Sequence, residues 1–252
     1  MKTLAILISL LFSTSAIFSQ VVENIIKPTG TVQYKFINKW EKKEHNSTLQ
    51  FNDHASLYFY GRTKDGLEQR EVKEVGNNTT LEIADAEGWS NYQNFEKKQF
   101  ISRDLIWTKF VLIEEETPDF AWNITDTQKK IGNFNCQEAI CTFRGRTYHA
   151  WFTMDIPMSI GPWKLSGLPG LILEAYDEDK EYQFVFVAIK IPTDDGTLII
   201  PPTLSKKKMN WVDFNDGRKR KLEEVTKMLS ADMNQDGSST IKLEVHNLEV
   251  FE

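Results

Sequence analysis

The residues that could do acid–base or anion chemistry in this chain are scattered and match no known catalytic motif. Its four histidines are scattered along the chain, and a lone histidine on a strand is typically a surface or hydrogen-bonded residue. Asp155 and Glu174 could act as a general acid and base, and Arg144 and Arg146 could bind an anion, although we expect the arginines to pair with carboxylates on adjacent strands. The sequence contains no Gly-x-Ser-x-Gly, His-Glu-x-x-His, Walker loop or Gly-x-Gly-x-x-Gly. Spacing alone therefore predicts no catalytic residue.

One acidic segment matches half of a calcium-binding loop. Asp232, Asn234, Asp236 and Gly237 fit the first half of an EF-hand, but position twelve, which should be a bidentate glutamate, is Leu243. The same residue types are common in ordinary turns. We therefore expect a turn here, with no metal and no cofactor.

The two cysteines, Cys136 and Cys141, lie five residues apart. On one strand they would point to opposite faces with Cα atoms about 16 Å apart, whereas a disulfide needs about 7 Å or less. No histidine stands at a spacing that would suggest a zinc site. We expect two free and mostly buried thiols.

The elements that must position these residues are mostly strands. Alternating apolar residues and turn signals predict strands and hairpins in succession, and an apolar stripe predicts a helix near the end. The predicted strands are 31–40, 47–52, 56–60, 93–102 and 105–114 around a turn at Arg103 and Asp104, 136–143, 147–154, 171–176 and 182–191, and the predicted helices are a short turn over 205–212 and a longer one over 218–228. The fold class is therefore mainly β (α+β): a curved antiparallel sheet, a half-open barrel or a sandwich, with one or two C-terminal helices.

The segment 182–191 is apolar on both faces. Tyr182, Phe184 and Phe186 alternate with Val185 and Val187. Antiparallel sheets commonly leave one face to water, so the second apolar face belongs either to the inside of a sandwich or barrel, or to a groove for an apolar ligand.

The first twenty residues and the composition predict an exported protein. Lys2, the apolar run 4–12 and the small residues of 13–20 form the pattern of a secretory signal peptide, so we expect cleavage near Ser19 or Gln20 and one β-rich domain over 21–252, in the periplasm or outside the cell. No cysteine adjoins the cleavage point, and no later run approaches the ~20 apolar residues of a transmembrane helix. We expect no lipid anchor and no stable membrane insertion. The formal net charge of -6, with both signs interspersed, predicts no binding to nucleic acid.

The densest conformational signal is the segment 161–172, in which three glycines and two prolines punctuate an apolar run. Proline fixes φ and glycine permits positive φ or close backbone approach. We expect two tight turns that form a rigid loop over 161–170 and present Trp163 and Leu168 to a ligand or partner.

Six short motifs surround this loop in a fixed order. They are Cys136-Gln-Glu-Ala139, Phe143-Arg-Gly-Arg146, Tyr148-His-Ala-Trp151, Asp155-Ile-Pro157, Gly161-Pro162 and Gly167-Leu-Pro-Gly-Leu-Ile172. In order and spacing they resemble the GLPGLI family, and the resemblance extends to Ile106-Trp107 and Trp122-Asn-Ile124. It implies an exported protein of Gram-negative bacteria, from a largely uncharacterised family whose genes often lie near those of TonB-dependent outer-membrane receptors. It thus implies a compartment and a role accessory to uptake, but no reaction.

Two functional hypotheses follow. The first is a binding protein of the cell envelope that uses an apolar sheet face and the 161–170 loop to hold a hydrophobic ligand, a peptide or an outer-membrane partner. Its predicted binding residues are Arg146, Trp151, Asp155, Trp163, Leu168 and Pro169. The alternative is an extracytoplasmic enzyme that uses Arg146 and Asp155 with a nearby carboxylate such as Glu174. The oligomeric state is not predicted.

Overall fold

A computed structural model describes residues 27–65, 67–75, 78–193, 197–204, 208–233 and 248–249. Most of the regular structure in these residues is antiparallel β. The elements are β1 (Gly30–Asn38), β2 (Lys43–Phe51), β3 (Ala55–Tyr60), β4 (Gln69–Val75), β5 (Asn78–Ala84), β6 (Trp89–Asn94), β7 (Gln99–Ile106), β8 (Lys109–Glu116), β9 (Asn123–Ile131), β10 (Phe134–Phe143), β11 (Arg146–Thr153), β12 (Leu171–Asp177), β13 (Tyr182–Lys190) and α2 (Trp211–Met233). The predicted signal peptide and residues 234–237 of the calcium-like segment lie outside the described residues, whereas Asp232 lies in the last turn of α2.

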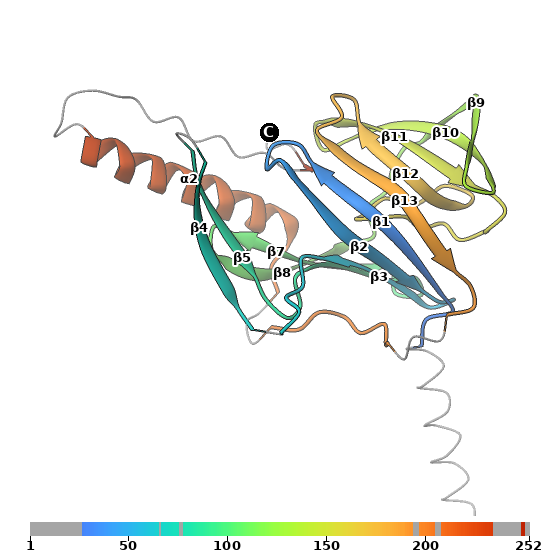
Figure 1. The fold of residues 1–252 in the computed structure, drawn as a ribbon, viewed down its shortest axis with the longest axis horizontal. Helices are drawn as coiled ribbons and strands as arrows, with labels where there is room; N and C mark the ends of the chain where they lie inside the picture. Colours follow the sequence, from blue (N-terminus) through green and yellow to red (C-terminus); the bar gives the residue numbers. More distant parts are fainter. Residues whose placement is uncertain are drawn as a thin grey trace, which may run out of the picture.

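Eleven strands form one antiparallel sheet in the order β8-β7-β6-β3-β2-β1-β13-β12-β11-β10-β9, and β4 and β5 form a separate hairpin. The sheet ends at β8 and β9 and is not closed into a barrel. Figure 1 shows it strongly bent, with α2 beside the half that carries β7 and β8. The predicted fold class, a curved β-rich sheet with a C-terminal helix, is confirmed.

The main hydrophobic core lies on one face of the sheet, which we call the inner face. Because successive side chains of a strand point to opposite faces, every second residue of β1 supplies this core: Val32, Tyr34 and Phe36 are all buried. Phe184 of β13 and Ala150 of β11 continue the core across the sheet.

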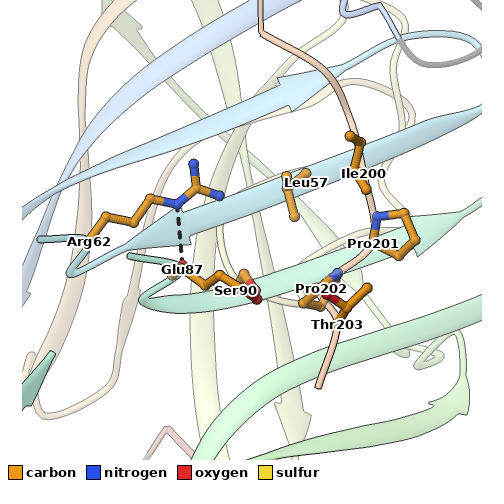
Figure 2. A pocket seen from close by; sticks show the side chains of 8 residues that line it. All are labelled: Leu57, Arg62, Glu87, Ser90, Ile200, Pro201, Pro202 and Thr203. Atoms are coloured by element: carbon orange, nitrogen blue, oxygen red, sulfur yellow. Dashed lines mark hydrogen bonds between the residues drawn. The ribbon is translucent and has the colours of Figure 1, made fainter. Parts of the chain in front are cut away.

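A smaller core lies on the opposite face, over β3, β6, β7 and β8. Leu57, Tyr92 and Ile101 pack there with Ile199. Ile199 belongs to the segment 197–204, which crosses this face of the sheet (Figure 2). Part of each face is therefore filled by the chain itself.

The strand β13 resolves the alternatives left open for its two apolar faces. Tyr182 and Phe184 are buried in the main core, whereas Val185, on the other face beside the exposed Lys35, is only half-buried. The inner face is thus packed core and the other face is partly open to solvent.

The predicted turn at Arg103 and Asp104 is wrong, because both residues lie inside β7, and the turn follows at Trp107, whose φ is 57°. The local sequence of this polar pair is typical of a turn, but Arg103 is buried and pairs with residues that are distant in the sequence. Its Nη2 lies 2.5 Å from Asp85 Oδ2, and its guanidinium lies 3.7 Å from the centroid of the Phe110 ring.

The C-terminal helix is longer than predicted and begins earlier. Asn210 caps it, since its Oδ1 accepts a hydrogen bond of 2.8 Å from the Asp213 amide. The helix therefore starts at Trp211, inside the range predicted for a short helical turn, and includes the predicted helix over 218–228.

Candidate functional site

The backbone of the 161–170 loop is fixed by its contacts with neighbouring segments of the chain. Gly167 has a φ of +94°, which only glycine adopts easily, and a Cβ at Gly170 would lie 2.1 Å from the Thr153 carbonyl oxygen. The Trp122 indole donates a hydrogen bond of 2.7 Å to the Ser166 carbonyl oxygen. Two glycines are therefore required, one for positive φ and one for close approach.

The side chains of this loop point into the protein, contrary to expectation. Trp163 and Leu168 are 8% and 1% exposed, and the Trp163 ring packs 5.6 Å from the ring of Tyr148 and 6.3 Å from that of Phe143. The expectation that they face outward is wrong. Their burial depends on contacts with residues outside the loop, such as Phe143 and Tyr148, which the sequence of the loop alone does not reveal. The loop fills the core and does not present these two side chains to a partner.

The loop also carries a buried cation. Lys164 is only 4% exposed, and its Nζ lies 2.6 Å from Glu115 Oε1 and 3.0 Å from Glu249 Oε1. A buried ammonium group is tolerated only when it is paired. Lys164 thus joins the loop to β8 and to the described pair Leu248–Glu249.

Arg144, in the turn between β10 and β11, completes this cluster. Its guanidinium pairs with the carboxylates of both Glu115 and Glu249, and lies 4.0 Å from the centroid of the Trp211 ring. The Trp211 Nε1–H donates a hydrogen bond of 3.0 Å to Glu249 Oε2. We call Arg144, Lys164 and Trp211 the Glu249 site.

The electrostatics of this site favour a bound carboxylate. Burial would raise the pKa of the Glu249 carboxyl, but the charges of Lys164 and Arg144 and the hydrogen bond from Trp211 outweigh it and hold the pKa below its usual value. The residue before Glu249 is also bound: the Tyr148 hydroxyl donates a hydrogen bond to the Leu248 carbonyl oxygen, and the Leu248 side chain packs against the main core.

Arg146 lies in a second ion-pair cluster. Its Nη1 lies 2.5 Å from Asp177 Oδ2 and 2.9 Å from Glu181 Oε2. Burial raises the pKa of the Asp177 carboxyl, despite the hydrogen bond from the Tyr182 amide and the charge of Arg146. The expectation that the two arginines pair with carboxylates is confirmed.

The three residues of the enzyme hypothesis are not brought together. Arg146 is the first residue of β11, and Asp155 follows its last residue, Thr153. A strand of this length places Arg146 and Asp155 more than about 20 Å apart. Glu174 pairs with Lys129 at 2.5 Å instead.

The remaining predicted binding residues lie in different environments. Trp151 is buried, with Lys129 Nζ 4.2 Å from the centroid of its ring, whereas Asp155 and Pro169 are exposed. Binding at Asp155 and Pro169 stays a prediction. Sequence reasoning missed Lys164, Trp211 and Glu249 entirely; the clearest available signal was a lysine inside an otherwise apolar loop.

One histidine is embedded in a polar cluster that no motif predicted. His149 Nε2 lies 2.8 Å from Glu178 Oε2, its Nδ1 lies 3.1 Å from Glu138 Oε1, and its ring stacks on Tyr176 with centroids 5.1 Å apart. Burial lowers its pKa, but the hydrogen bonds to both glutamates outweigh this and raise it. The expected hydrogen-bonded histidine is confirmed here.

The cysteines are free and buried, as predicted. Burial, with a smaller contribution from Glu174, raises the pKa of the Cys136 thiol to about 11, and burial raises that of Cys141 to about 12. Both thiols are therefore protonated at neutral pH and are poor nucleophiles.

A shallow pocket lies where the segment 197–204 crosses β3 and β6 (Figure 2). Arg62 Nε donates a hydrogen bond of 3.2 Å to the Glu87 carbonyl oxygen at one side, and Pro201 and Pro202 line the other. Its volume of about 180 Å³ is below the ~300 Å³ at which small-molecule sites begin. The Glu249 site is the better candidate.

One comparison with known protein families matches part of this region. The family model described as "Protein of unknown function (Porph_ging)" matches residues 141–174. This stretch contains the GLPGLI-type hexapeptide and the residues Arg144, Tyr148 and Lys164. No curated protein matches the chain.

Two solved structures share the fold. They are titled "Structure of PNGF-II in P21 space group" and "Structure of PNGF-II in C2 space group", with TM-scores of 0.52 and 0.50, each at 14% identity over 78% of this chain. The matched region is only 34% of each of those chains, so this chain spans about a third of their length. At this identity the likeness concerns the fold alone.

Proposed function

We propose that this chain is an exported cell-envelope protein that binds a segment of a polypeptide partner on the inner face of its sheet. One observation carries the proposal: this face already holds a dipeptide, Leu248–Glu249, through side chains from four elements of the fold. These are Tyr148 of β11, Arg144 and Lys164 of the turn and loop around it, and Trp211 of α2.

The contacts are of the kinds that recognise a peptide. A hydroxyl donates to a main-chain carbonyl, a core surface takes an apolar side chain, and two cations with an indole N–H take a carboxylate. Few, convergent polar groups around an apolar surface are typical of binding sites. A polypeptide partner is therefore favoured over a small hydrophobic ligand, since Trp163 and Leu168 are committed to the core.

Export is supported by the signal-peptide pattern of residues 1–20. None of the helices in the described residues is long and apolar enough to cross a membrane. The GLPGLI-type resemblance adds an outer-membrane protein as the class of partner, which would make this protein accessory to uptake.

A random-peptide selection against the full-length chain tests the proposal. We expect short peptides to be enriched. In a background that carries Leu248→Ala and Glu249→Ala, where the internal dipeptide competes less, they should bind Tyr148→Phe about 2- to 10-fold more weakly, because this change removes one hydrogen bond to a peptide carbonyl. Tyr176→Phe, the same change on the opposite face, is the matched control and should leave binding unchanged. Failure to enrich any peptide, or equal loss in both variants, would contradict the proposal.

A further inference from the structure

We propose that the Glu249 site is a receptor for an acidic side chain of the partner peptide, and that Glu249 is its displaceable occupant within the same chain. The inference rests on the proposed function and adds the class of ligand: a peptide in which an apolar residue precedes a glutamate or aspartate.

Both carboxylate oxygens of Glu249 are recognised separately. Oε1 accepts from Arg144 and Lys164, and Oε2 accepts from the Trp211 indole at 3.0 Å. An arginine, a lysine and an indole directed at the two oxygens of one carboxylate form a specific acceptor for that group.

The site is held in place by contacts that do not involve Glu249. Glu115 pairs with both Arg144 and Lys164, and the Arg144 guanidinium stacks over the Trp211 ring. These contacts would persist if Glu249 left, so the donors stay oriented for another carboxylate. Such preorganisation reduces the entropy lost when a ligand binds.

The charge balance requires an anion. Arg144 and Lys164 contribute two positive charges, Glu115 and Glu249 supply two negative charges, and the nearby Arg218 and Asp104 carry one charge of each sign. Without Glu249 one positive charge would be left largely buried, which is unfavourable. When the acidic side chain of a partner replaces Glu249, the net charge of the site is the same before and after the exchange.

The neighbouring contact defines the second ligand position. Tyr148 donates to the Leu248 carbonyl, and the Leu248 side chain packs on the core, so the residue before the acid should be apolar. Glu249 belongs to the same chain as its site, so its binding there is intramolecular and needs no encounter with a second molecule. Glu249 should therefore compete with partner peptides and weaken their apparent binding.

The test uses full-length protein and a fluorescent peptide of residues 244–252, Glu-Val-His-Asn-Leu-Glu-Val-Phe-Glu. By fluorescence anisotropy, Glu249→Ala should bind this peptide at least about 10-fold more tightly than the wild-type chain, because the competing side chain is gone. A peptide with glutamine in place of Glu249 should bind the variant about 10-fold more weakly or worse, because a charge-assisted contact is lost.

A double variant and a control separate recognition from folding. Lys164→Met combined with Glu249→Ala leaves Arg144 and Glu115 as a neutral pair, so it should fold but lose the preference for glutamate. Lys35→Gln with Glu249→Ala removes an exposed cation that pairs with Glu44 and should bind as Glu249→Ala does. If Glu249→Ala does not fold, Leu248→Ala, which keeps all four charges, should bind the peptide more tightly than the wild type.

The outcomes distinguish the two proposals. Equal binding of the glutamate and glutamine peptides would overturn the carboxylate receptor and make Glu249 a structural ion pair only. Selected peptides that lack an acid but still depend on Tyr148 would overturn this inference and leave the proposed function intact. If neither the selection nor the 244–252 peptide gives binding, the proposed function fails as well.

Discussion

Replacement of Trp163 by alanine tests whether the 161–170 loop is part of the core. The side chain is 8% exposed and packs against Tyr148 and Phe143. Emptying a core aromatic site costs about 3–5 kcal/mol in the free energy of unfolding. In a domain of this size each kcal/mol lowers Tm by about 2–4 °C, so Trp163→Ala should lower Tm by about 6–20 °C.

Urea unfolding followed by circular dichroism measures the same quantity directly. Trp107→Ala is the matched control, because that ring is 48% exposed, and its loss should change the free energy of unfolding by less than about 1 kcal/mol. If Trp163→Ala were as stable as Trp107→Ala, the ring would not be part of the core. The argument that the loop fills the interior would then be refuted.

Three further predictions concern the backbone, the pH dependence and the N-terminus. Gly170→Val should prevent folding or strongly destabilise the protein in thermal melts, since its Cβ would lie 2.1 Å from a carbonyl oxygen, whereas Gly217→Ala, where the nearest atom is a side-chain methyl at 3.0 Å, should be tolerated. The net rise in the pKa of His149 means that its charged form adds stability below the unfolded pKa of about 6.5, and that this stability is lost as pH rises through the higher folded pKa. The difference in unfolding free energy between wild type and His149→Gln should accordingly shrink from about pH 5.5 to about pH 8.5; a constant difference would contradict the assignment of the partners. Intact-mass analysis of protein from the native host should give a mature chain that begins at Gln20 or Val21; a retained N-terminus or an attached lipid would refute export by a cleaved signal peptide.

The strands could be predicted because the residues that determine them lie close together in the sequence. The hairpins 136–143 with 147–154 and 171–176 with 182–191 correspond to β10 with β11 and β12 with β13, since alternation and turn residues occur within a few positions of each other. The turn assigned to Arg103 failed because its partner, Asp85, lies 18 residues away. Such a contact leaves no periodic signal.

The candidate site could be predicted only in part for the same reason. The family-like motifs marked the turn of Arg144 and the loop of Lys164, but the ligand that joins them, Glu249, lies 85 residues beyond Lys164. The burial of Lys164 is likewise a tertiary effect. Pro162 and Trp163 before it read locally as a surface turn, whereas the packed strands turn this segment inward.

The two edges of the large sheet differ in their exposure to self-association. The β8 edge is extended by Met209, whose amide and carbonyl bond with Leu112 and Glu114 at 2.9 and 2.8 Å. The β9 edge is bounded by β10 alone among the described strands, and it carries the exposed Lys130, while Lys129 pairs with Glu174. Lysines on an open edge discourage another strand from pairing with it. Another part of the chain thus shields one edge, and a charged side chain shields the other. Both features would prevent copies of the protein from pairing edge to edge into fibrils at high concentration.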